Sequence, residues 1–497
     1  MRKTATFKTL FHNIFIKITL FSLFFWIENP TLFAQKITAS EPYTLEQRED
    51  YMMVGRIADT SLFLLYEEDN FRLMQFDAAL KTRFTEKIKP ERHSIELLQT
   101  VLDKAFFTVL YKHSGGGRSS LKAMRISSQG KILDTLTLQS TNQWGVVYQP
   151  RLVLSDDRSK LLAYDLVENN TMFNTTVFDL KTFKTLWIRT FRPTALDYHN
   201  SLHQALVDNA GGVYWTIERD NRKAKLMSNR FEIIYYTPEL SQEWSTLVPI
   251  PNRFWQKAMF VVDNKNKKLL CAGYCSTRKA AKSEGVFYFS ITPLFQTVAD
   301  VFFSDFDATF MQQITGKAQA NNPSFEDMEL RQIVVRADGG VVMVGEHYKK
   351  YVRYSTNPAM MQRGSFGTGM PMDTRTTTDY EYHDILLVSI QANGQKNWNA
   401  ILPKRQFSED DDGLYSSFFV LKNKTGLRFL YNDEIKSGGN VNEYLMQADG
   451  TAQRRNIFNS EKQSLQLVMS EAKQVSAAVL VVPSLVRNKL QMVEVQY

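Results

Sequence analysis

Cysteine is nearly absent from this sequence, which has two among its 497 residues, Cys271 and Cys275. On a strand, residues four apart share a face but lie about 13 Å apart, which is too far for a disulfide. We therefore expect two buried thiols, with a redox or metal pair as the alternative. This sparing use of cysteine agrees with export from the cytoplasm without establishing it.

An excess of charge of one sign is also largely absent. The formal net charge is +8, and the first 34 residues hold +3 of it, which leaves about +5 for the other 463 residues. Basic and acidic side chains are interspersed along that part of the chain. Because no basic stripe stands out, we expect no nucleic-acid partner.

Familiar catalytic motifs are missing as well. The chain has neither the Gly-x-Ser-x-Gly elbow of serine hydrolases nor the His-Glu-x-x-His of zinc proteases. Scattered carboxylates that meet in a central channel after folding would form a glycosidase-type pair, but no spacing in the sequence indicates one. The sequence therefore assigns no catalytic, cofactor-binding or metal-binding residue, and we expect no cofactor.

Long apolar runs are absent beyond the N-terminus. Residues 18–27 (ITLFSLFFWI) follow a basic segment and precede Ala34. Ten such residues suit a secretory signal peptide and are too few to span a bilayer. We expect residues 1–34 to be cleaved and the protein to be periplasmic or otherwise exported, without a later membrane span. Because Leu32 fits the cleavage motif imperfectly, an uncleaved anchor is the alternative.

What the sequence does contain is a repeated hairpin. Its clearest copy joins strands at residues 385–391 and 396–402 through a turn in which Gly394 provides conformational freedom. Ile390 before the turn and Trp398 after it are eight positions apart. The same or a nearly equal offset separates Phe76 from Phe84, Phe178 from Trp187 and Tyr236 from Trp244. We interpret these pairs as packing between the outer strands of each repeat.

The hairpins belong to units of four strands. Unit starts fall near residues 51, 95, 151, 203, 258, 330, 417 and 465, and the last unit, with candidate strands at 465–469, 477–482 and 490–495, is one strand short. Such spacing predicts an all-β fold, a single β-propeller over residues 35–497 with eight blades of four antiparallel strands. A strand at 35–39 would complete the last blade and close the ring. Seven blades are the alternative.

Local motifs resemble known propellers. The segment at 150–164, with counterparts at 334–346 and 420–433, resembles repeats of TolB-type propellers, and the hairpin with its trailing tryptophan resembles quinoprotein-type repeats, which commonly form eight blades. Residues 384–433, with ILPKRQ at 401–406 and FLYND at 429–433, resemble uncharacterised exported proteins of Bacteroidota. These resemblances imply a fold and no particular activity.

Two insertions interrupt the predicted ring. Residues 304–326 contain a candidate short helix before Pro323. Residues 350–380, rich in Tyr, Met, Gly and Thr, fall between the second and third strands of the sixth unit. We expect this insertion not to be a strand pair throughout and to project as a long hairpin loop, either as a contact site for a partner or as a disordered excursion.

Four of the seven histidines form two candidate pairs. His199 and His203 lie in an expected connection without Cys, Asp or Glu at ligand spacing, so we expect ordinary loop histidines rather than a metal site. His347 and His383 flank the larger insertion on strands that should pair, so they could approach one another.

Two further segments imitate ligand-binding loops. Residues 410–413 (DDDG) lack the alternating oxygen ligands and distal Glu of a calcium loop, so we expect a solvated acidic turn. Residues 114–118 (SGGGR) lack the Lys-Ser/Thr of a phosphate loop, and we expect a hairpin tip.

Together these observations favour a non-enzymatic, extracytoplasmic protein-interaction platform of the cell envelope. We expect a monomeric ring that binds another envelope protein. The alternative is a propeller enzyme or glycan-binding protein with its site in the central channel. Clustered carboxylates with aromatic neighbours would favour that alternative, whereas a mixed or plugged lining would favour the platform.

Overall fold

The computed structural model describes residues 35–497 apart from short internal stretches. The stretches outside the description are 68–69, 91–93, 116, 142–147, 168–170, 195, 197–200, 220–228, 241, 278–281, 294–296, 299, 317–324, 357–373 and 436–438. The proposed signal peptide, residues 1–34, also lies outside the described residues. Among those described, no helix is long and apolar enough to cross a membrane.

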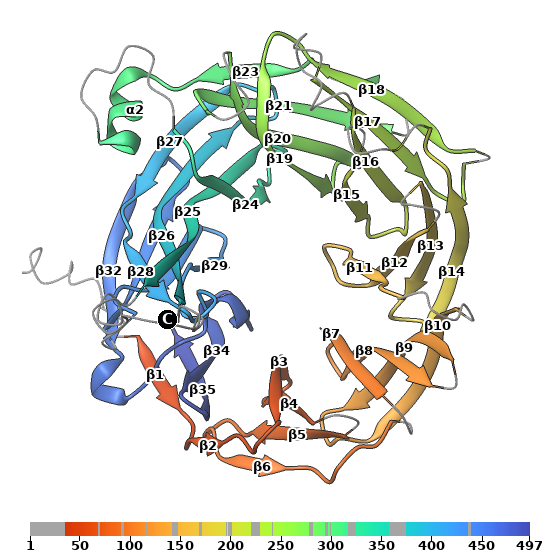
Figure 1. Cartoon of the computed structure of the whole chain (residues 1–497), viewed down its shortest axis with the longest axis vertical. Coiled ribbons are helices and arrows are strands. Elements are labelled where there is room, and N and C mark those ends of the chain that lie inside the picture. Colours follow the sequence, from red (N-terminus) through yellow and green to blue (C-terminus); the bar gives the residue numbers. More distant parts are fainter. Residues whose placement is uncertain are drawn as a thin grey trace, which may run out of the picture.

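Eight antiparallel sheets follow one another around a ring, as Figure 1 shows. Each sheet is one blade, and its first strand lies innermost. Blade 1 contains β3 (Asp50–Ile57), β4 (Thr60–Glu67), β5 (Asn70–Phe76) and β6 (Thr82–Phe84). Blade 2 contains β7 (Ser94–Leu102), β8 (Phe106–Gly115), β9 (Arg118–Ser127) and β10 (Ile132–Thr141). Blade 3 contains β11 (Arg151–Leu154), β12 (Lys160–Val167), β13 (Met172–Asp179) and β14 (Lys184–Phe191). Blade 4 contains β15 (Leu202–Val207), β16 (Val213–Arg219), β17 (Asn229–Tyr236) and β18 (Trp244–Ile250).

The second half of the ring repeats the pattern with additions. Blade 5 contains β19 (Phe254–Asp263), β20 (Lys268–Ser276), β21 (Gly285–Thr292), β22 (Thr297–Val298) and β23 (Phe302–Asp305). Blade 6 contains β24 (Met328–Val335), β25 (Val341–Thr356), β26 (Thr374–Ile390), β27 (Lys396–Leu402) and β28 (Gln406–Glu409). Blade 7 contains β29 (Phe419–Lys422), β30 (Gly426–Asn432), β31 (Asn440–Gln447) and β32 (Ala452–Asn459). Blade 8 contains β33 (Lys473–Gln474), β34 (Val479–Val486) and β35 (Lys489–Gln496).

The N-terminal strand closes the ring as the sequence predicted. β1 (Lys36–Ala39) pairs antiparallel with β35 and becomes the outer strand of blade 8, and β2 (Tyr43–Thr44) pairs with the other end of β35. The ends of the chain therefore share one sheet, so the eight-blade prediction is confirmed and the seven-blade alternative is wrong.

Apolar side chains fill every junction between neighbouring blades. Eight buried clusters can be distinguished, one for each pair of neighbours, and the cluster that joins blade 8 to blade 1 contains Met53, Phe63, Val481 and Met492. Each blade is apolar on both faces because both faces are covered, so no blade could bury its surface alone. The core is thus a continuous band around the ring.

Some details differ from the sequence-based expectations. The innermost strand of blade 8 is β33 rather than residues 465–469, which make one isolated bridge, Leu467 to Ser484, and then a short 3-10 turn. Leu465, Leu467 and Met469 alternate like a strand because they pack between blades 7 and 8. The outer strand expected at 298–303 in blade 5 is divided into β22 and β23, which both pair with β21.

The outer-strand tryptophans bridge blades, which corrects their expected role within one blade. Trp398 donates through Nε1 to the carbonyl of Ala448 in blade 7 at 3.0 Å, and Trp187 donates to that of Gly211 in blade 4 at 3.0 Å. Each indole therefore reaches a turn of the next blade. The repeated aromatic is a marker of the junction between blades.

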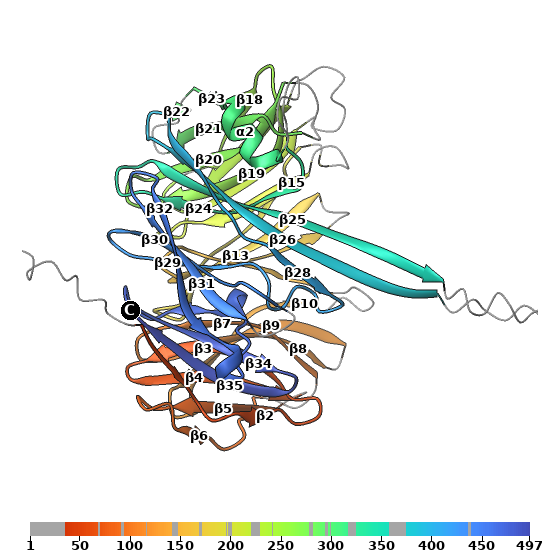
Figure 2. The same cartoon turned by 90° about the vertical axis from the view of Figure 1, so that its left-hand side faces the viewer.

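One face of the ring carries the larger elaborations. In a four-stranded antiparallel blade, the turn between the second and third strands and the link to the next blade lie on the same side. On this side, α2 (Ala308–Thr315) fills part of the predicted 304–326 insertion, capped by Asp307, which confirms the short helix. The β25–β26 hairpin projects far beyond the ring on this side (Figure 2).

Candidate functional site

The candidate site is the projecting part of β25 and β26, residues 349–356 and 374–380, which we call the arm. From Tyr348–Tyr382 to Thr356–Thr374, nine consecutive residue pairs are in register. The expected hairpin loop at 350–380 is therefore a strand pair over residues 350–356 and 374–380, and residues 357–373 lie outside the described residues. Nine residues extend about 30 Å. β-Branched and aromatic residues, frequent here, suit such a ribbon.

A bulge marks the root of the arm. His347 alone on β25 stands opposite both His383 and Asp384 on β26, because the register shifts between Glu346 and Tyr348. An extra residue in one strand bends and twists a hairpin locally. The sequence-based expectation that the two histidines approach one another is confirmed: their rings stack with centroids 5.4 Å apart and planes 6° apart.

The histidine pair has a mixed environment. Burial and the neighbouring His347 ring lower the pKa of His383, while Glu381, 3.7 Å from its Nε2, opposes that shift. Within the described part of the chain, no group of three or more His, Cys, Asp or Glu residues is placed to hold a metal ion. Burial therefore favours the neutral imidazole form of His383.

Beside the bulge lies a buried cluster of charges centred on Glu346. Its side chain is fully buried and accepts from Arg331 Nε on β24 at 2.8 Å and from Ser417 Oγ, before blade 7, at 2.8 Å. The Lys404 ammonium stands 2.8 Å from its other oxygen, as an ion pair without the alignment of a hydrogen bond. A buried carboxylate needs such partners because removal from water disfavours its charge.

Lys404 joins the arm to the next blade. Its side chain is fully buried, and its ammonium donates to the carbonyl of Tyr382 at 3.0 Å and to Gln406 Oε1 at 2.7 Å. Burial lowers the pKa of Lys404, whereas Glu346 favours its charged form. Gln406 in turn donates to the carbonyl of Asn432 in blade 7 at 2.6 Å.

The ILPKRQ motif at 401–406 and the FLYND motif at 429–433 thus have a structural role. Lys404 binds Gln406 within the first motif, and Gln406 meets Asn432 of the second. Asn432 Nδ2 donates to the carbonyls of Tyr415 and Leu467 at 2.8 Å each. These contacts join blade 6 to blade 7 and to the segment that enters blade 8. They hold the root of the arm against the ring.

Ion pairs fix the middle of the arm. The Arg353 guanidinium on β25 binds Asp379 on β26 and, 2.7 Å away, Glu409 on β28. Asp379 is almost fully buried, although it lies beyond the blade itself. Bidentate and shared guanidinium contacts impose geometry as well as charge balance, so they hold the two strands at a defined orientation.

The acidic turn at 410–412 caps the arm rather than forming a calcium loop. Asp410 receives the Thr378 N–H at 2.7 Å, Asp411 receives the Gly413 N–H at 2.9 Å, and Asp412 receives the Tyr380 hydroxyl at 2.6 Å. The three carboxylates accept hydrogen bonds from three different protein donors instead of converging on one point. A calcium site requires convergent oxygens, so this geometry does not fit that ion.

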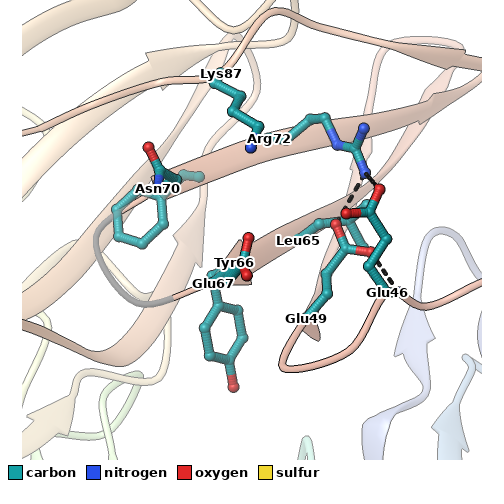
Figure 3. Close-up of a pocket in the computed structure, with 9 residues that line it drawn as sticks. Glu46, Glu49, Leu65, Tyr66, Glu67, Asn70, Arg72 and Lys87 are labelled. Atoms are coloured by element: carbon teal, nitrogen blue, oxygen red, sulfur yellow. Dashed lines mark hydrogen bonds and ion pairs between the residues drawn. The ribbon is translucent and has the colours of Figure 1, made fainter.

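A small pocket lies where the N-terminal segment crosses blade 1 (Figure 3). Its volume is about 60 Å³, and its lining includes Glu46, Glu49 and Arg72. Arg72 donates to Glu49 at 2.9 Å and to the Tyr43 hydroxyl at 2.6 Å, and burial together with Glu49 raises the pKa of Tyr43 to about 12. The space suits a few waters, and its polar groups pin the closing segment.

The remaining candidates have structural environments. His203 lies on β15 and bonds Glu218 at 2.8 Å and the Ala258 carbonyl at 2.9 Å, so it is a half-buried link between blades rather than a loop histidine; His199 lies outside the described residues. Cys271 and Cys275 are buried free thiols on β20, and burial raises the pKa of Cys275 to about 12. Residues 114–118 form the expected tip of the β8–β9 hairpin, of which Gly116 lies outside the description.

Two carboxylates on the innermost strands are paired with cations. Glu329 on β24 lies 2.8 Å from Lys257 on β19, and Glu96 on β7 lies 3.1 Å from Lys112. A glycosidase needs two carboxylates that face one bond at a defined separation. These two carboxylates belong instead to separate ion pairs in different blades.

Comparisons with known proteins bear on the fold alone. No family model matches the chain, and no curated protein matches it. Among solved structures, the β-propeller domain of the Trilobed protease from Pyrococcus furiosus is 9% identical, with a TM-score of 0.34, over 86% of this chain and 97% of that one. A prolyl endopeptidase is 10% identical, with a TM-score of 0.38, over 91% of this chain and 55% of its own length. Polysaccharide lyase Uly1 is 7% identical, with a TM-score of 0.37, over 80% of this chain and 89% of that one. Likeness at this level carries no argument about activity.

Proposed function

We propose that the protein is a non-enzymatic interaction platform of the cell envelope and that the arm is its contact element. The observation that carries this proposal is the combination of an exposed ribbon with a buried, ion-paired root. Val352 and Tyr354 are 44% and 75% exposed, whereas Glu346 and Lys404 at the root of the arm are fully buried. A pre-organised element loses little conformational freedom on binding, which favours recognition.

Placement in the envelope rests on the N-terminal segment. Residues 1–34 have the basic, apolar and small-residue order of a secretory signal, so the ring would act outside the cytoplasm. A partner there would be another exported or membrane-attached protein. The alternative, a site in the central channel for a reaction or a glycan, finds less support because Glu329 and Glu96 are engaged in ion pairs.

Affinity capture from envelope extracts tests the proposal. The intact protein is compared with a variant in which residues 350–380 are replaced by a short Asn-Gly turn joining the two strands. We expect a protein recovered reproducibly by the intact chain and lost with the arm, while both proteins unfold at similar temperatures. Recovery that does not depend on the arm, or no recovery at all, contradicts the proposal.

A further inference from the structure

The outer edge of β25 is open along the arm. At the root, the Tyr348 N–H donates to the Asp327 carbonyl at 2.8 Å, and the preceding chain then turns away at Asp327, whose φ is 58°. Beyond Tyr348, no strand in the described part of the chain pairs with this edge of β25. An open edge presents a row of main-chain donors and acceptors that can pair with another strand.

The direction of these main-chain groups follows from strand geometry, because every second residue of a strand points its N–H and C=O toward the same edge. Because the Tyr348 N–H points away from β26, the N–H and C=O of Lys350, Val352 and Tyr354 point the same way. The opposite edge of the arm is different: at Thr378 the N–H donates to the Asp410 carboxylate at 2.7 Å, and its carbonyl accepts from the Asp410 N–H at 2.9 Å. The outer edge of β26 is therefore hydrogen-bonded near the root of the arm, whereas the outer edge of β25 is open to pairing with another strand.

The sequence of the open edge is self-complementary. If two copies of residues 350–354 (KYVRY) pair antiparallel about Val352, Lys350 of one copy faces Tyr354 of the other, and Arg353 faces Tyr351. Lys350 then meets an aromatic ring, a favourable cross-strand and cation–π combination, while the Arg353 guanidinium keeps its ion pairs with Asp379 and Glu409. Lys350 already takes such a position within its own chain, 5.0 Å above the Tyr380 ring.

Neighbouring registers lack this complementarity. Pairing about Lys350 or Arg353 would place two copies of one cation opposite each other, and pairing about Tyr351 would place Lys349 opposite Arg353. Like charges directly opposite each other destabilise a sheet. The register about Val352 also makes the three outward-facing residues meet one another, so that three residue pairs could exchange about six main-chain hydrogen bonds.

We propose that two copies of this chain dimerise through the open edges of their arms, antiparallel and centred on Val352. The four arm strands then form one ribbon with a two-fold axis, and the two rings lie at its opposite ends because each hairpin starts from its own ring (Figure 2). Pairing covers the exposed faces of Val352 and Tyr354. The interface is small, so we expect a Kd on the order of 10 µM. This departs from the monomer expected from the sequence.

Analytical ultracentrifugation of the purified protein tests the edge. Across about 1 to 200 µM, a range that brackets the expected Kd, we expect a monomer–dimer equilibrium. Val352→Pro removes an outward N–H without touching the β25–β26 ladder, as proline does when it sits on an edge strand. It should weaken dimerisation about tenfold or more. The matched variant Thr376→Pro removes an outward N–H from the other edge of the same ribbon and should leave the equilibrium unchanged.

A charge exchange tests the register. Tyr354→Lys places a lysine opposite Lys350 of the second copy and should weaken the dimer, whereas the double variant Lys350→Tyr with Tyr354→Lys restores a lysine–tyrosine pair and should recover it. A monomer at every concentration overturns the proposal. So do equal effects of the two proline variants and a double variant no tighter than Tyr354→Lys.

The dimer uses the same arm as the proposed function, but its test needs no partner protein. Loss of dimerisation in Val352→Pro with unchanged capture of an envelope protein supports the dimer and shows that the partner uses another part of the arm. Capture that ignores the arm contradicts the proposed function and leaves the ultracentrifugation result to decide the dimer.

Discussion

At the scale of single residues, one buried lysine holds the candidate site together. Lys404 contacts Glu346, the carbonyl of Tyr382 and Gln406, and so joins strands of the arm to the link that leads to blade 7. The motif that contains it was visible in the sequence, but its partner Glu346 was not. A glutamate that ends the apolar run VVMVG of β25 was the signal available. The ion pair between Lys404 and Glu346 joins residues far apart in the sequence, so it becomes visible only in the folded structure.

Replacing Lys404 with methionine should destabilise the protein strongly. The change leaves Glu346 buried without its ammonium partner, and breaking a buried pair in this way costs about 3–5 kcal/mol. Lys257→Met is the matched control, because its ion pair with Glu329 is partly exposed and worth at most about 1 kcal/mol. Urea denaturation measures both. Equal losses in the two variants would contradict a special role for Lys404.

His383 should make the stability of the protein depend on pH. His383 has a lowered pKa in the folded state, so the unfolded chain binds its proton first as the pH falls. Stability is therefore full above about pH 6.5 and is lost as the pH falls toward the folded pKa. When the pH is lowered from about 7.5 to about 5.5, we expect the melting temperature of His383→Gln to fall less than that of the native chain. An equal fall of the melting temperature in His383→Gln and the native chain would contradict a role for His383. So would an equally reduced fall in the control His113→Gln.

At the scale of elements, the arm is where sequence and structure differ most. The insertion was placed correctly between the second and third strands of blade 6, but its strands continue to Thr356 and Thr374 instead of ending near Glu346 and Asp384. The Gly- and Pro-containing middle of the insertion suggested a loop. What extends the ribbon is support from elsewhere, since β28 pairs with its base and Arg353 binds Glu409 of β28 from its middle.

Hydrogen exchange resolved to single amides should display the ribbon directly. The N–H groups of Lys349, Tyr351 and Arg353 point toward β26, whereas those of Lys350, Val352 and Tyr354 point away from it. In dilute protein we expect the first set to exchange at least about tenfold more slowly than the second, because ladder hydrogen bonds protect amides. Uniformly fast exchange across both sets would mean that the insertion is not a strand pair.

At the scale of the whole molecule, the ring was the most predictable feature. Unit spacing, repeated hairpins and a final unit lacking one strand together predicted eight blades and closure by the N-terminal strand, which the pairing of β1 with β35 confirms. The spacing of the strands can be read from the sequence because each blade is built mainly from one continuous segment of the chain. The inner strand of blade 8 was missed because Leu465, Leu467 and Met469 imitate a strand while they pack between blades.

A cross-link between the ends of the ring tests its closure most directly. Lys36 and Gln496 are paired on β1 and β35 and both are exposed, so cysteines there would lie within disulfide range. Cys271 and Cys275 are buried and need no replacement. We expect Lys36→Cys with Gln496→Cys to oxidise in the native protein and to raise the free energy of unfolding by about 2–4 kcal/mol. The off-register pair Lys36→Cys with Glu494→Cys should stay reduced. Free thiols in the first pair, or equal oxidation in both, would contradict a ring closed by its first strand.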